Sequence, residues 1–198
     1  MKKRMTALLL SACICAGLAG CGTNTPGNNP GHTKNDSSVT SLTDNITVTP
    51  VKTDITSFDQ LKNGINEFSM NMYSALPADK NIFYSPYSIA SALSMLDVGA
   101  GGATKNELEN ALGITDLDKW NDEMKAYLSK DWSQNTFVNT ANSIWMNKGT
   151  TWATNINSDF LTPAKDYYSG EVYEADFDGQ ADKVVQNVNN WVSDNTNK

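Results

Sequence analysis

Apolar residues recur at helical spacing in several separate stretches of the chain, which predicts a helix-rich domain. From Ser57 to Leu76 they form one stripe, and Ser57 with Gln60 has the pattern of a capping box at the start of that helix. Pro77 would end it. Further helices are expected at 104–112, 116–128, 155–168 and 181–195. The last has an apolar stripe of Val184, Val185, Val188, Trp191 and Val192.

The most informative run extends from Asn81 to Gly113, because Ile82 to Leu96 contains no charged side chain. Ser85-Pro86 favours a helix start, since Ser caps and Pro suits the first helical position. Apolar residues at helical spacing follow (Ile89, Ala92, Leu93, Leu96). A helix with no charged face is usually buried on most sides. Glycines then break it, Thr104 and Glu107 form a second capping box, and Gly113 ends the next helix.

Three stretches favour strands, which makes the expected fold class α+β. Residues 82–84 lead into the buried helix. From Thr136 to Met146 the helical period is lost, and apolar residues on both faces indicate a central strand. Glu171 to Phe177 alternates. Pro163 lies inside the helix expected at 155–168 and should kink or restart it.

The first residues have the character of a processing signal. Lys2, Lys3 and Arg4 precede a short apolar core from Ala7 to Ala19, and Leu18-Ala19-Gly20-Cys21 resembles a bacterial lipobox. Residues 1–20 are therefore expected to be a lipoprotein signal peptide, with an ordinary secretory signal as the alternative. Residues 21–53 are rich in Gly, Asn, Thr, Ser and Pro and predict a flexible tether. The folded domain is expected at 54–198.

Charge and composition exclude several kinds of site. The net charge is −7, which argues against a nucleic-acid partner because phosphate contacts need clustered Lys and Arg. His32 is the one histidine, and Cys21 would be the one cysteine after signal removal, so His- or Cys-based catalysis and zinc sites lack partners. No cofactor is expected. Asp176 and Asp178 stay open as paired carboxylates, with a solvated acidic loop the favoured interpretation.

The run N-I-F-x-S-P-x-S-I-x-x-A-L-x-M-x-x-x-G-A-x-G-x-T-x-x-E-L, which begins at Asn81, resembles the segment that opens the body of a serpin. The sequence Asn142-Ser143-Ile144-Trp145-Met146 resembles the end of a long strand in the main serpin sheet. The run V-N-N-W-V-S-x-x-T-N, from Val188, is similar to the helix across the front of that sheet. The resemblance covers the N-terminal half of the family fold, from about Phe58 to Lys198.

This resemblance implies a suicide inhibitor of extracellular serine proteases and, less often, cysteine proteases, tethered to the membrane or cell surface. It assigns no catalytic residue to the chain, because the protease supplies the chemistry. It places Ser85 and Ser88 in the family's shutter region, a conformational switch beneath the sheet. The plainer alternative is that Ser85 caps the helix and Ser88 fills space. The reactive loop would lie beyond Lys198, so this portion alone is expected not to inhibit and to leave apolar faces and strand edges uncovered.

Two other functions stay open. One is a serpin-fold protein that does not inhibit and serves as a binding or structural lipoprotein. The other is an extracellular solute-binding lipoprotein, which would show an alternation of strands and helices that this chain lacks.

The lipobox predicts that Cys21 is the lipid-carrying first residue of the mature protein. Changing Cys21→Ser should release or mislocalise the protein, because no acyl chains would then hold it in the bilayer. Mass spectrometry of the membrane fraction measures this. An unmodified Cys21, or a mature N-terminus elsewhere, contradicts the prediction.

Overall fold

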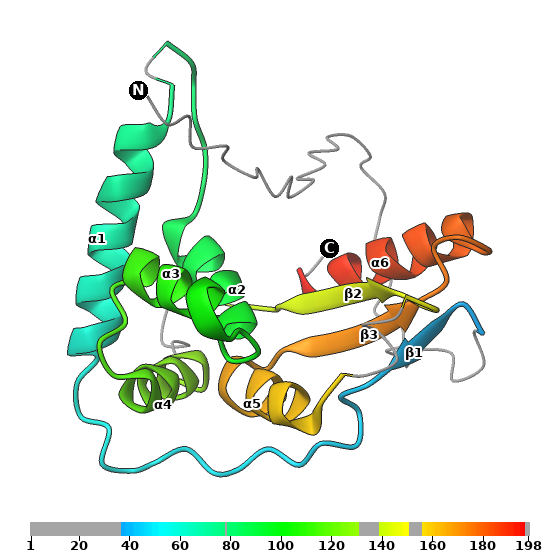
Figure 1. The fold of residues 1–198 in the computed structure, drawn as a ribbon, viewed down its shortest axis with the longest axis horizontal. Helices are drawn as coiled ribbons and strands as arrows, with labels where there is room; N and C mark the ends of the chain where they lie inside the picture. The colour runs from blue at the N-terminus through cyan, green and yellow to red at the C-terminus, as the bar shows by residue number, and fades with distance from the viewer. Residues whose placement is uncertain (1–36, 78, 131–138, 151–155, 197–198) are drawn as a thin grey trace, which may run out of the picture. The chain divides into compact units, whose positions relative to one another are not determined.

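A computed structural model describes residues 37–77, 79–130, 139–150 and 156–196 of the chain. Its elements, in chain order, are β1 (Val39–Ser41), α1 (Asp59–Ala75), α2 (Pro86–Asp97), α3 (Gly102–Leu112), α4 (Leu117–Leu128), β2 (Ser143–Asn147), α5 (Ser158–Tyr168), β3 (Glu171–Ala175) and α6 (Ala181–Asn195). The three strands form one mixed sheet in the order β1-β3-β2 (Figure 1). The expected α+β class is therefore confirmed.

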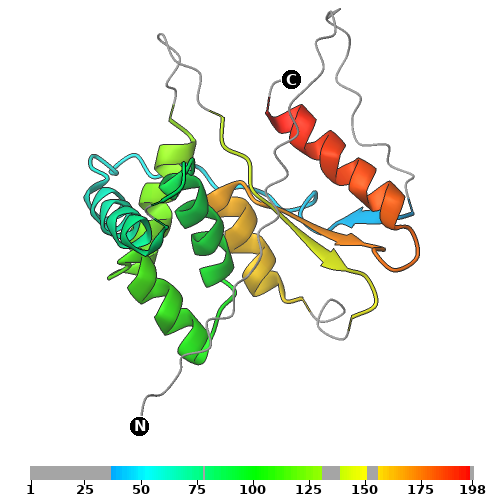
Figure 2. The same ribbon diagram turned by 90° about the horizontal axis from the view of Figure 1, so that it is seen from above.

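The sheet has two different faces. β2 runs parallel to β3 with Trp145 opposite Tyr173, and β1 runs antiparallel to β3 on its other side. Since neighbouring residues on a strand point to opposite faces, Met146 and Val172 point to one side and Trp145 and Tyr173 to the other. Met146 and Val172 belong to the main core, whereas α6 lies across the other face (Figure 2).

The main core lies where α1 to α5 meet the first face of the sheet. Its buried members come from all of these helices and from β2 and β3: Leu61, Phe68, Ala90, Met95, Leu112, Trp120, Met124, Met146, Ala164, Tyr168 and Val172. Trp120 and Met124 of α4 are fully buried. Burial of such large apolar side chains is the main stabilising term of a domain of this kind.

A close approach between α1 and the α3–α4 connection depends on glycine. A Cβ atom on Gly64 would lie 2.4 Å from the carbonyl oxygen of Leu112 and 2.7 Å from the Trp120 ring. Gly113 ends α3 with φ +69°, a left-handed conformation that glycine adopts readily. The expected end of this helix at Gly113 is confirmed.

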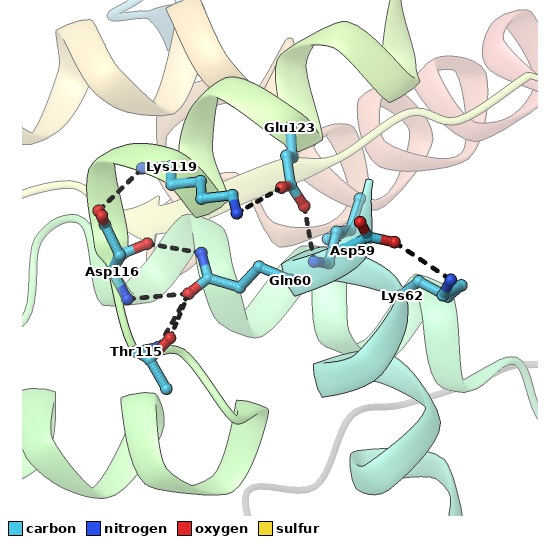
Figure 3. Close-up of polar contacts among 8 residues, drawn as sticks. Asp59, Gln60, Lys62, Thr115, Asp116, Lys119 and Glu123 are labelled. Carbon is cyan, nitrogen blue, oxygen red and sulfur yellow. Dashed lines mark hydrogen bonds and ion pairs between the residues drawn. The ribbon is translucent and has the colours of Figure 1, made fainter. Parts of the chain in front are cut away.

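Side chains from two helices fix the start of α1 (Figure 3). The Gln60 Oε1 atom accepts hydrogen bonds from the backbone N–H of Asp116 at 2.9 Å and from the Thr115 hydroxyl at 2.6 Å, and Gln60 Nε2 donates to the Asp116 carbonyl. Glu123 of α4 accepts from the backbone N–H of Leu61 at 2.8 Å, which satisfies one of the free donors at the N-terminus of α1. The expected capping box of Ser57 and Gln60 is wrong because Gln60 binds this neighbouring connection instead.

Several sequence expectations need correction. Thr104 and Glu107 form no capping box, since α3 begins at Gly102 without a side-chain cap. Residues 82–84 form no strand and have no strand beside them among the described residues, and a strand needs a partner for its backbone groups. α5 is one continuous helix through Pro163, so the expected alternative of a restart is wrong, and the alternative of a kink stays a prediction. The strand expected from Thr136 is described only from Ser143 to Asn147, and residues 136–138 lie outside the described residues.

Residues 37–53 are part of the fold, which corrects the expected tether over 21–53 for this portion; residues 21–36 lie outside the described residues. β1 covers the outer edge of β3, and the Thr43 hydroxyl accepts from the backbone N–H of Val172. Thr49 donates from its backbone N–H to Asp166 Oδ1 at 2.6 Å and from its hydroxyl to Asp166 Oδ2 at 2.8 Å. The composition of residues 37–53 is typical of a loop. The segment is held in the fold by hydrogen bonds to residues more than a hundred positions away in the sequence.

Asp166 and Lys125 form a buried ion pair beneath this segment. The Lys125 ammonium group lies 2.8 Å from Asp166 Oδ1 and 2.6 Å from the Thr49 hydroxyl, and both charged side chains are less than a tenth exposed. Burial raises the pKa of Asp166, but the hydrogen bonds from Lys125 and Thr49 together outweigh burial and hold that pKa below its ordinary value. The ion pair therefore joins α4, α5 and the N-terminal segment.

We predict that Asp166→Asn lowers the free energy of unfolding by about 3–5 kcal/mol at pH 7, because it leaves the buried Lys125 charge without its counter-ion. Because the folded-state pKa of Asp166 is depressed, its contribution is present above the unfolded-state pKa and is lost as the pH falls. The difference between the variant and the wild type should therefore shrink in acid. Urea unfolding at a series of pH values measures it.

Asp122→Asn is the matched control. It breaks the pair with Lys52, whose side chain is 60% exposed, and such a pair contributes about 0–1 kcal/mol. Equal losses in the two variants would contradict the assignment of Asp166 as a buried anchor.

Candidate functional site

The candidate site is built from α2, the beginning of β2 and β3, and the face of the sheet beneath α6. Ser85 and Pro86 start α2 as expected: the Ser85 hydroxyl accepts from the backbone N–H of Ser88, and Pro86 is the first helical residue. The helix then presents its smallest residues, Ala90, Ser91 and Ser94, to the interior.

Two buried serines of α2 connect the helix to its neighbours. The Ser91 hydroxyl accepts from Asn142 Nδ2 at 3.0 Å, and the Ser94 hydroxyl accepts from the indole N–H of Trp120 at 3.0 Å. Asn142 also accepts the backbone N–H of Glu171 on its carbonyl oxygen. One residue therefore joins α2 to the point where β2 and β3 begin side by side.

The apolar stripe expected from the sequence is not the most buried side of α2. Ile89, Ala92 and Leu93 are half-buried and Leu96 is exposed, whereas the small polar face is fully buried. Ser91 and Asn142 were missed as functional residues. Two features of the sequence could have pointed to them. Asn142 is the first residue of the strand motif, and α2 carries serines at positions where a buried helix usually has larger side chains.

Ser85 and Ser88 lie exposed at the N-terminus of α2, and their hydroxyl oxygens are 2.9 Å apart. The capping role of Ser85 is confirmed. Their assignment to the shutter region stays a prediction, because it concerns central sheet strands that belong to other parts of the family fold.

A buried carboxyl group lies at the end of α2. Asp97 is fully buried, neither of its oxygens has a hydrogen-bond partner among the described residues, and Lys105 lies 3.6 Å away. Burial raises the pKa of Asp97 against the attraction of Lys105. Nearby, burial also raises the pKa of Tyr168, whose hydroxyl donates to Asn121.

The face of the sheet beneath α6 carries an aromatic and carboxylate cluster. The rings of Trp145 and Tyr173 stack with centroids 4.3 Å apart. The Tyr173 hydroxyl and the Trp191 indole N–H of α6 both donate to the same oxygen of Glu171, each at 2.5 Å. Burial, and then the bond to Glu171, raise the pKa of Tyr173.

The acidic pair has a structural role in the turn that follows β3. Asp176 accepts from the backbone N–H of Gly179 at 2.8 Å, and this bond lowers the pKa of Asp176. Asp178 accepts from the side-chain amide of Asn147. Within the described ranges, His, Cys, Asp and Glu side chains nowhere gather in a group of three that could hold a metal ion. Cys21 and His32 lie outside the described residues.

Comparisons with known proteins place this arrangement in a family. The model of the family described as Serpin (serine protease inhibitor) matches residues 63–198. The chain therefore belongs to the serpin family. Mouse neuroserpin is 35% identical over 143 residues, which are 67% of this chain and 33% of that protein. An uncharacterized serpin-like protein of Thermococcus kodakarensis is 31% identical over 155 residues, 72% of this chain and 35% of its own length.

Among solved structures, the thermophilic serpin tengpin in its native state aligns with a TM-score of 0.63 and 27% identity, over 81% of this chain and 40% of that chain. The chain spans about a third of the length of the curated relatives it matches. Among the described helices, none has an apolar stretch long enough to cross a bilayer.

For the shutter assignment we predict that Ser88→Phe, made in the complete product of the reading frame, destabilises the native sheet and promotes polymers or a latent form. The resemblance implies that central sheet strands pack near the N-terminus of α2. A bulky ring at Ser88 would push them away and would remove the bond to Ser85. Native gels after mild heating measure the conversion.

Ser74→Phe is the control, because Ser74 lies on the exposed side of α1 and its hydroxyl donates to the Asn71 carbonyl of the same helix. A Ser88→Phe protein that stays monomeric and native at raised temperature would show that the shutter assignment is wrong.

Proposed function

We propose that this chain is the N-terminal part of a serine-type endopeptidase inhibitor that acts by suicide loop insertion. In such a mechanism the catalytic serine of the protease attacks a peptide bond in an exposed loop of the inhibitor. The amine end leaves and an acyl-enzyme ester remains. The cut loop then inserts as a new strand in the main sheet and carries the attached protease with it, so that the protease active site is distorted before water can release it.

The observation that carries this proposal is the match to the serpin family over residues 63–198. The geometry is consistent with it: a sheet with a packed helical core behind one face and a single helix lying across the other offers a platform that can accept an added strand. No residue of this chain is assigned a catalytic role, since the nucleophile and the base belong to the protease.

We further propose that the inhibitor acts outside a bacterial cell, held at the membrane or cell surface through lipid on Cys21. The lipobox resemblance of residues 18–21 supports this. The partner of the complete protein would be an extracellular serine protease or, less often, a cysteine protease. With β1 and residues 42–53 bound to the domain, the linker available to separate the domain from the lipid is shorter than the sequence pattern indicates.

The second candidate is a serpin-fold protein that binds or supports without inhibiting, since some members of the family do not inhibit proteases. The two candidates differ in the hinge of the reactive loop, where small residues permit insertion and bulky or charged residues oppose it.

The proposal is tested on the complete translated product of the reading frame that encodes these residues. The product is mixed with trypsin-like and subtilisin-like proteases. An inhibitor of this type should form a complex of the two proteins that survives boiling in detergent, because an ester bond joins them. The same protease with its catalytic serine replaced by alanine is the control and should form no such complex.

Cleavage of the product without a stable complex, with every protease of both classes, would contradict inhibition and favour the second candidate.

A further inference from the structure

α6 is attached to the sheet by few apolar contacts. Val184 and Trp191 are buried, but Val185 is 54% and Val192 is 38% exposed, although all four belong to the stripe expected from the sequence. Val188, on the same side as Val184 and Trp191, is half-buried, and polar residues complete the inward side of the helix. Asn187 donates to the Ser38 hydroxyl at 3.3 Å, and the Asn195 carbonyl near the end of the helix accepts from Asn139.

These buried apolar residues are separate from the main core. Val184, Trp191 and Tyr173 are buried, yet none of them belongs to the cluster that joins α1 to α5 with the other face of the sheet. α6 can therefore detach without opening that core. Local opening of this kind is expected where an element has few buried apolar contacts.

The strongest attachment on this face is the Glu171 carboxylate. It accepts the Trp191 indole N–H from α6 and the Tyr173 hydroxyl from its own strand on a single oxygen. Hydrogen bonds to an ionised acceptor are roughly twice as strong as bonds between neutral groups. The bonds between Asn187 and the Ser38 hydroxyl and between Asn139 and the Asn195 carbonyl, by contrast, join neutral groups.

The surroundings fix the position of this carboxylate. Tyr173 cannot turn away easily, because the Trp145 ring stacks on it from β2. The Trp145 indole N–H in turn donates to the Ser143 hydroxyl, and Ser143 lies opposite Glu171 in the register of the two strands. Glu171, Tyr173, Trp145 and Ser143 thus form a connected set that spans β2 and β3 under the helix.

We propose that Glu171 is a latch that holds α6 on the sheet, and that it acts through Trp191 and Tyr173 to set how readily the helix releases. Glu171 is a positioning residue, since it touches neither the protease nor the reactive bond. The second part of the proposal rests on the proposed function: if a new strand enters the sheet whose face α6 covers, loss of the Glu171 bonds raises the rate of insertion.

The first test is hydrogen exchange of the α6 amides in the complete product of the reading frame. Glu171→Ala should increase their exchange rate by roughly 10- to 100-fold, the factor expected when hydrogen bonds to a charged acceptor are lost. The amides of α2, which lie in the main core, should exchange at the wild-type rate. Glu171→Gln keeps the shape without the charge and should give an intermediate increase.

Glu174→Ala is the matched control, because Glu174 lies on the same strand but points to the opposite face of the sheet. It should leave α6 exchange unchanged. Trp191→Phe, which keeps a ring but removes the N–H donor, should accelerate exchange in the wild-type background and add little once Glu171 is alanine. Unchanged α6 exchange in Glu171→Ala, or an equal increase throughout α2 and α6, would overturn the latch.

The second test measures the same variants against a protease that the wild-type protein traps. Glu171→Ala should raise the rate at which the detergent-stable complex forms, whereas Glu174→Ala should not. Fast α6 exchange with an unchanged trapping rate would overturn the role in insertion and leave the latch itself standing. A wild-type protein that traps no protease would instead contradict the proposed function, and the exchange experiment would still decide the latch.

Discussion

The buried face of α2 places two hydroxyl groups in the interior of the domain, and both are hydrogen-bonded to neighbouring elements. An unpaired buried hydroxyl group would cost about 1–3 kcal/mol, and an apolar replacement of larger size would not fit beside the fully buried Trp120. Ser94 binds Trp120 and so holds α4, while Ser91 binds Asn142 and so holds the beginning of the sheet. The relative placement of helices and strands depends on these two contacts.

The N-terminal segment extends this arrangement to the outer edge of the sheet. An uncovered edge strand exposes backbone groups that can pair with another chain, and β1 covers that edge of β3. Thr49 then ties the same segment to the buried pair of Lys125 and Asp166. A stretch with the composition of a linker has thereby become a structural part of a serpin domain.

The two faces of the sheet differ in how firmly they are held. On one face Met146 and Val172 share a continuous apolar core with five helices, so that face cannot open without loss of the whole core. On the other face α6 is held by the buried side chains of Val184 and Trp191, by the Glu171 carboxylate and by hydrogen bonds between neutral groups. This difference fits the proposed loop insertion, in which the face packed on the core would stay in place while the face covered by α6 changes.

Much of this architecture could be predicted from the sequence, because it follows from local patterns. The capped start of α2 at Ser85, the glycine end of α3 at Gly113 and the bounds of α6 all rest on residues within one or two turns of each other. The family resemblance likewise rests on contiguous motifs, and the family match confirms it. These features need no knowledge of which segments meet in space.

What only the tertiary structure decided depends on partners far apart in the chain. Thr49 is held in place by its hydrogen bonds to Asp166. Gln60 does not cap its own helix but binds the connection at Asp116. In the sequence, Glu171 has the pattern of an ordinary exposed residue of an alternating strand. In the fold, Trp191 of α6 lies against it and donates a hydrogen bond to its carboxylate. The physical reason is the same in each case. A polar side chain takes its role from the donor or acceptor that burial places beside it, and local periodicity carries no information about that neighbour.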